Sequence, residues 1–110
     1  MIQQGDIEFV RTKLLPWSGV KAVKIAWSNS TKSWPDIWVQ TGEVPVITVT
    51  KEWARQDVHE RRKRLVHEFL HLKGLNHPEG GSIRIGKYVY STFPASDSYS
   101  KAVYRQLIQQ

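Results

Sequence analysis

The sequence predicts a single α+β domain with two helices, three short strands that would form a small mixed or mainly antiparallel sheet, and a C-terminal helix or tail. Three short segments with strand-like patterns lie between two segments whose apolar residues have helical spacing. The chain has 110 residues, of which 40% are hydrophobic. This length supports one hydrophobic core but not two, so residues 1–110 are treated as one domain.

The first predicted element is a short amphipathic helix over residues 6–15. Its apolar residues recur with a period close to that of an α-helix, so one face can be buried. These residues are Ile7, Val10, Leu14 and Leu15. Pro16 follows directly and should end the helix, because proline lacks the backbone N–H that a helix interior requires.

Three predicted strands follow this helix. Residues 21–27 alternate between polar and apolar side chains, which predicts a half-buried strand. Residues 37–41 form a second short strand that Gly42 ends. Residues 44–50 are rich in β-branched side chains and form the third strand, whose start Pro45 places toward a sheet edge.

The clearest helix prediction covers residues 58–73, a stretch without Gly or Pro. Asp57 is the expected N-cap, with Glu60 as its capping-box partner, and Gly74 is a natural C-terminal stop. At 100° per residue, three apolar side chains fall on one face, which should point into the core. They are Leu65, Phe69 and Leu72.

The last third of the chain predicts a strand or hairpin over residues 82–90, a turn at residues 94–96 and a helix over residues 97–109. The helix would bury Tyr99, Val103 and Leu107, which would complete the core. Of the five tryptophans, most should also be buried in a domain this small. They are Trp17, Trp27, Trp34, Trp38 and Trp53.

Charge and composition exclude several classes of protein. Without cysteine the chain has no disulfide scaffold, Cys-ligated zinc finger or thiol nucleophile. No apolar run is long enough to cross a bilayer, and the first residues lack the features of a secretory signal, so we expect a cytoplasmic protein. The net charge is +6, and residues 61–64 form a basic run. This run is either a solvated helix start or a patch for nucleic acid or acidic substrates.

Residues 67–77 contain the pattern HExxHxxGxxH. His67 and His71 lie four residues apart on the predicted helix, so both imidazoles project from one side and can bind one Zn²⁺. Gly74 permits a sharp turn that can bring His77 to the same ion as a third ligand. Three nitrogen ligands leave a fourth position open, which is typical of catalytic zinc sites.

Glu68 is the predicted catalytic residue because it follows the first histidine directly and points beside the metal. There it can take a proton from zinc-bound water and later pass it on. The plainer interpretation makes His67 and His71 ordinary surface residues of a basic helix. His59 lies about 12 Å upstream of His67 along the helix axis and is expected to be exposed rather than a ligand.

On these residues the chain resembles the minigluzincin family of minimal soluble zinc metallopeptidases, within the zincin clan. The metzincins share the extended motif, but they also carry a methionine turn downstream, whereas the only methionine here is Met1. The resemblance implies a zincin-like fold, with a small sheet, a backing helix and an active-site helix. It also implies one zinc ion per chain on His67, His71 and His77. Glu68 would be the general base in the hydrolysis of protein or peptide substrates.

The family also tends to latency, so residues 94–110 are either the end of the core or an inhibitory segment that covers the cleft. An inhibitory segment could dock within one chain or be swapped between two chains of a dimer. The donor that stabilises the transition state is not identified by the motif, and Tyr88, Tyr90 and Tyr99 are the candidates.

Two alternative functions remain. The run from His71 to His77 also resembles the motif of bacterial rRNA-maturation endoribonucleases, which are zinc-dependent and cut single-stranded RNA, and the basic charge agrees. That family has glycine where this chain has Glu68, and a carboxylate beside the metal suits amide hydrolysis, so nucleic acid is the less favoured partner. The second alternative is a zinc-binding domain without catalytic activity.

Overall fold

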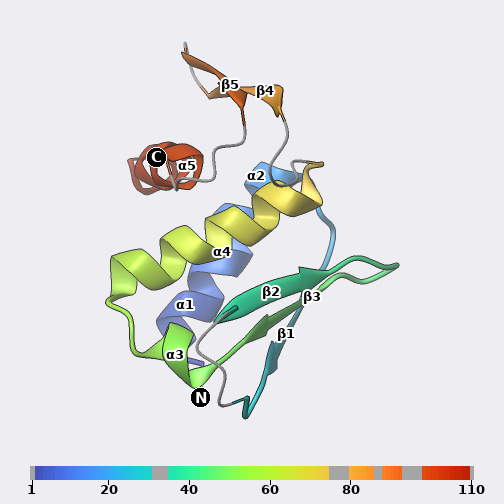
Figure 1. Cartoon of the computed structure of the whole chain (residues 1–110), viewed down its shortest axis with the longest axis vertical. Helices are drawn as coiled ribbons and strands as arrows, with labels where there is room; N and C mark the ends of the chain where they lie inside the picture. Colours follow the sequence, from blue (N-terminus) through green and yellow to red (C-terminus); the bar gives the residue numbers. More distant parts are fainter. Residues whose placement is uncertain (1, 31–34, 75–79, 86–87, 93–97, 110) are drawn as a thin grey trace.

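Helix α4, Val58–Leu72, lies at the centre of the fold, and the other helices and a mixed three-stranded sheet surround it (Figure 1). This computed structural model describes residues 2–30, 35–74, 80–85, 88–92 and 98–109. Helices from both ends of the chain and strand β2 pack against α4. The predicted α+β class and the small mixed sheet are therefore confirmed.

The N-terminal helix is longer than predicted and runs past Pro16. It consists of α1 (Gln4–Phe9), a π-helical segment η1 (Val10–Leu14) and α2 (Leu15–Ser18). The prediction that Pro16 ends the helix is wrong, because Pro16 falls in the first turn of α2, where its missing N–H is tolerated. Gly19 ends the helix instead, with a φ of 76° that favours glycine.

The three predicted strands form one mixed sheet in the order β1-β3-β2. Strand β3 (Val46–Val49) pairs in parallel with β1 (Lys24–Trp27) and antiparallel with β2 (Ile37–Gln40). The expected edge position for the third strand is wrong, since β3 is central. Pro45 lies just before β3, and its carbonyl accepts a hydrogen bond from the Lys24 amide, so the proline needs no N–H there.

A short helix that the sequence analysis missed, α3 (Lys51–Ala54), connects the sheet to α4. Thr50 caps α3 by accepting a hydrogen bond from the Trp53 amide. The predicted N-cap residue of α4, Asp57, is confirmed, because its Oδ1 accepts from the Glu60 amide at 2.9 Å. The Glu60 carboxylate pairs with Lys63 and Arg64, so its side chain supports the next turn of α4.

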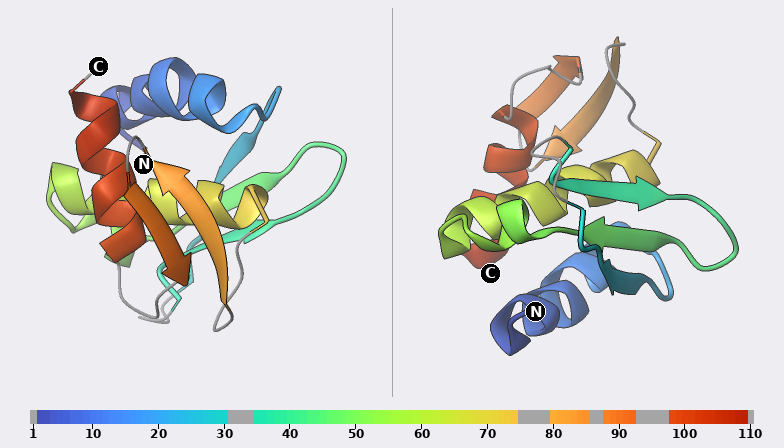
Figure 2. Two further views of the ribbon diagram at one scale, coloured as in Figure 1. Left: turned by 90° about the horizontal axis from the view of Figure 1, so that it is seen from above. Right: turned by 60° about the horizontal axis from the view of Figure 1, so that its bottom comes forward.

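After α4 come the hairpin of β4 (Gly80–Ile85) and β5 (Tyr88–Thr92), and then helix α5 (Ser98–Ile108). The hairpin lies beyond the C-terminal end of α4, away from the three-stranded sheet (Figure 1). Helix α5 crosses α4 and packs against it, as the view from above shows (Figure 2). The predicted hairpin and C-terminal helix are both present.

The core lies between α4, the N-terminal helix, the sheet and α5. On α4 the buried apolar residues are Leu65, Val66, Phe69 and Leu70, while the predicted core residue Leu72 is partly buried. Helix α5 contributes Tyr99, Val103, Tyr104 and Leu107. The described tryptophans are less buried than predicted: Trp53 is enclosed, whereas Trp17, Trp27 and Trp38 are half-buried, and Trp34 lies outside the described residues.

The basic run at residues 61–64 is tied into the fold by carboxylates. Asp6, which is buried in α1, accepts from Arg61 Nε at 2.8 Å and from Arg62 Nε at 3.0 Å. Lys63 pairs with Glu60, and Arg64 pairs with the buried Asp36. The pairs with Asp6 and Asp36 fix α4 against α1 and against the segment before β2, so the run has a structural role.

Candidate metal centre

The two histidines of the HExxH motif converge in the C-terminal half of α4. The Nε2 atoms of His67 and His71 lie 3.2 Å apart, and the two rings stand edge to face with their centroids 4.9 Å apart. Both residues are half-buried, so their ring nitrogens are partly shielded from water. Two Zn–N bonds of about 2.0–2.1 Å can reach one ion from nitrogens at close to this separation.

Glu68, between the two histidines in sequence, is only 5% exposed. Burial raises the pKa of its carboxyl from 4.5 to about 8 in the metal-free chain, because charge is costly to hold away from water. The motif placed Glu68 beside the metal, but it did not indicate that the carboxyl is buried. That burial comes from the packing around α4, which a local sequence pattern does not record.

The third predicted ligand, His77, belongs to residues 75–79 and lies outside the described residues. Gly74 does adopt the left-handed backbone conformation that was expected, with a φ of 101°. Within the described ranges, no three His, Cys, Asp or Glu side chains form a group that could hold a metal ion. Ligation by His77 therefore stays a prediction.

Sequence analysis did not single out Ser100, a residue of α5 that contacts the motif. Its Oγ lies 3.4 Å from His67 Nδ1, the ring nitrogen that does not face His71. Ser100 is 1% exposed. One signal could have found it: Ser100 precedes Val103, Tyr104 and Leu107 by three, four and seven residues, which makes it a polar residue on the inward face of the helix.

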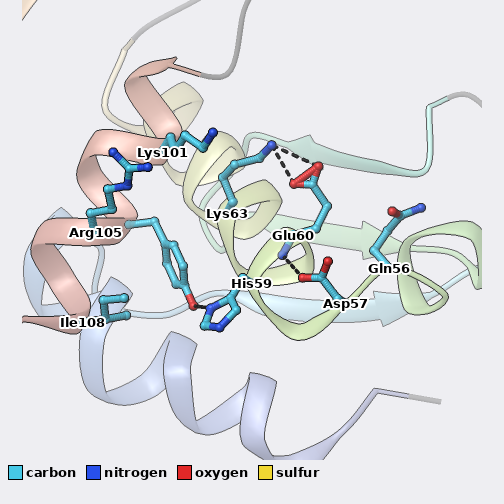
Figure 3. Close-up of a pocket in the computed structure, with 9 residues that line it drawn as sticks. Gln56, Asp57, His59, Glu60, Lys63, Lys101, Arg105 and Ile108 are labelled. Atoms are coloured by element: carbon cyan, nitrogen blue, oxygen red, sulfur yellow. Dashed lines mark hydrogen bonds and ion pairs between the residues drawn. The ribbon is translucent and has the colours of Figure 1, made fainter.

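A separate pocket of about 570 Å³ lies between the first half of α4 and α5 (Figure 3). His59, which is exposed as predicted, bonds through Nδ1 to the Tyr104 hydroxyl at 2.6 Å. Most of the remaining lining residues are charged, with both signs present: Asp57, Glu60, Lys63, Lys101 and Arg105. Because His59 precedes His67 by two turns of helix, the pocket is distinct from the converging histidines.

Of the tyrosines considered as transition-state donors, Tyr99 is buried in the core at 2% exposure. Tyr88 and Tyr90 belong to β5, and their side chains lie outside the described part of the structure. The identity of the donor therefore stays open between these positions.

Comparisons of the chain with protein-family models, with curated proteins and with solved structures find no match. Within the described residues, no helix is both long and apolar enough to cross a membrane. Inferences about function therefore depend on the motif and on the geometry of α4 and α5.

Proposed function

We propose that this chain is a zinc-dependent metallopeptidase that cleaves internal peptide bonds of protein or peptide substrates. The observation that carries the proposal is the convergence of the His67 and His71 Nε2 atoms at 3.2 Å, with the buried carboxyl of Glu68 next in sequence to His67. In this class of enzyme, two imidazoles on one helix bind the zinc ion and an adjacent carboxyl acts as the general base.

The donor set suits zinc. Neutral imidazole is a good ligand for Zn²⁺, and an ion held by His67, His71 and His77 would keep an open position for substrate. When bound, zinc would supply Lewis-acid chemistry by polarising the scissile carbonyl and by making water more acidic. His67 and His71 are half-buried, which limits competition from bulk water for the metal.

Glu68 supplies the proton transfers. Its carboxylate accepts a proton from the water that attacks the carbonyl carbon, and it then delivers that proton to the departing amide nitrogen. The carbon–oxygen bond forms first, and the carbon–nitrogen bond breaks after the nitrogen has received the proton, so the products are a carboxylic acid and an amine. Because Glu68 is buried, packing restricts the positions that its carboxyl can take.

The ribonuclease alternative receives less support from the fold. The basic run at residues 61–64 was the feature that favoured RNA binding. Each cation of this run is paired with a carboxylate of the same chain. Paired cations attract a polyanion less strongly than free ones. A zinc-binding domain without activity remains the third outcome of the test.

The test compares zinc-loaded wild type with Glu68→Ala on a quenched-fluorescence peptide library and on single-stranded RNA. We expect peptide cleavage that a chelator abolishes, and a loss of about 10²–10⁴-fold in Glu68→Ala with zinc still bound. Glu60→Ala on the same helix is the matched control and should remain active. Cleavage of RNA alone, or zinc binding without any hydrolysis, would contradict the proposal.

A further inference from the structure

We infer that Ser100, on the C-terminal helix, is a positioning residue for the metal centre: its hydroxyl holds the His67 ring so that Nε2 faces the metal. The inference rests on the proposed zinc site. It goes beyond that site because Ser100 is remote in sequence from the HExxH motif and forms no part of it. Three observations carry it.

The first observation is that the two ring nitrogens of His67 face different partners. Nε2 faces His71 Nε2 at 3.2 Å, whereas Nδ1 faces Ser100 Oγ at 3.4 Å. An imidazole that binds a metal through one nitrogen carries its proton on the other. Metal binding through Nε2 therefore makes Nδ1–H a donor, and the Ser100 oxygen is placed to accept from it.

The second observation is that Ser100 is buried. It is 1% exposed, and the buried residues Tyr99 and Val103 flank it on the helix that packs against α4. A buried serine has few rotamers open to it, so its oxygen stays near one position. Such an oxygen can fix the orientation of the ring, which an exposed side chain or bulk water would not do.

The third observation concerns the chemistry of the position. Ser100 occupies an inward-facing place among apolar side chains, where alanine would pack equally well and would favour the helix more. A buried hydroxyl is costly unless it has a hydrogen-bond partner. His67 Nδ1 lies within reach of this hydroxyl, so the oxygen can orient the ring.

The role has a general precedent in the physics of metal sites. Groups that hydrogen-bond to the distal nitrogen of a ligating histidine fix its tautomer and orientation, and their loss typically weakens metal binding 10–100-fold. Helix α5 is thus expected to act on the metal centre through one contact, in addition to filling the core.

The experiment measures zinc affinity by competition with a chromophoric chelator in wild type, Ser100→Ala and Val103→Ala. Ser100→Ala removes only the oxygen, so we expect a melting temperature close to wild type and zinc affinity weaker by about tenfold or more. Val103→Ala, one turn further along the same helix, should melt at a lower temperature yet keep its zinc affinity. This control distinguishes weaker zinc binding caused by general destabilisation of α5 from weaker zinc binding caused by loss of the Ser100 hydroxyl.

A second readout is the imidazole Nδ1–H proton of His67 in the zinc-loaded protein, observed by NMR. In wild type this proton should exchange slowly with water, and in Ser100→Ala it should exchange faster, while the corresponding proton of His71 stays unchanged. Equal zinc affinity and equal exchange in wild type and Ser100→Ala would overturn the inference alone. Wild type that binds no zinc would overturn the proposed function, and the role of Ser100 with it.

Discussion

Removal of the C-terminal segment decides whether it is part of the core or an inhibitory plug. A chain that ends at Ala95 lacks all of α5 and with it four buried apolar side chains: Tyr99, Val103, Tyr104 and Leu107. Full burial of a large apolar side chain contributes about 1.5–3 kcal/mol, so the four together contribute about 6–12 kcal/mol. This is comparable with the whole free energy of unfolding of a small domain, about 5–15 kcal/mol.

We therefore expect the truncated chain to be unfolded or partly folded at room temperature and to lack peptidase activity. Circular dichroism melts and peptide cleavage of the two lengths, measured on zinc-loaded samples, check this. The single variant Leu107→Ala should remain folded but lose about 2–5 kcal/mol of stability, since it leaves a cavity in the same interface.

The inhibitory interpretation predicts the opposite result. If α5 only covered a cleft, the chain ending at Ala95 would keep its melting temperature and cleave peptides faster than the full chain. That outcome would refute the reasoning from burial. In the structure α5 packs on α4 of its own chain, and the mass of the wild-type particle in solution tests whether two chains exchange this helix.

Two further substitutions test the electrostatics of the fold. In the metal-free chain, stability should fall as the pH rises from about 4.5 to about 8, because folded Glu68 keeps a proton that the unfolded chain has released. The stability of Glu68→Gln should not fall over this pH range, and above pH 8 this variant should be more stable than wild type by on the order of 4–5 kcal/mol. Profiles of unfolding free energy against pH that run parallel for the two proteins, measured in chelator, would contradict this expectation. Asp6→Asn should lose about 3–5 kcal/mol in denaturant titrations, because it leaves the buried Arg61 without its counter-charge. A loss below about 1 kcal/mol would show that Asp6 is not the partner that holds α1 to α4.

Much of the fold could be predicted because the chain carries strong local signals. The N-cap Asp57 and the stop at Gly74 bracket α4, and β-branched residues mark the strands. Two wrong predictions concern prolines, whose effect depends on the surrounding fold as well as on the adjacent residues. Pro16 is tolerated after a π-helical turn, and Pro45 lies just outside the central strand, and neither context is visible in the residues next to the proline.

The candidate site likewise has features that the sequence could predict and features that it could not. The i, i+4 spacing of His67 and His71 follows from helix geometry, so the convergence of their Nε2 atoms was predictable. The burial of Glu68 depends on the packing around α4, and the contact from Ser100 depends on how α5 crosses α4. The contact between Ser100 and His67 joins residues more than thirty positions apart, so no local pattern predicts it.

The most direct test of the account is the location and coordination of zinc in crystals of the full chain. Data collected on both sides of the zinc absorption edge should show one anomalous peak per chain. We predict that it lies about 2.0–2.1 Å from the Nε2 atoms of His67 and His71, with a nitrogen of His77 as the third ligand. A zinc ion bound elsewhere, or no peak in a chain loaded with equimolar zinc, would contradict the central claim.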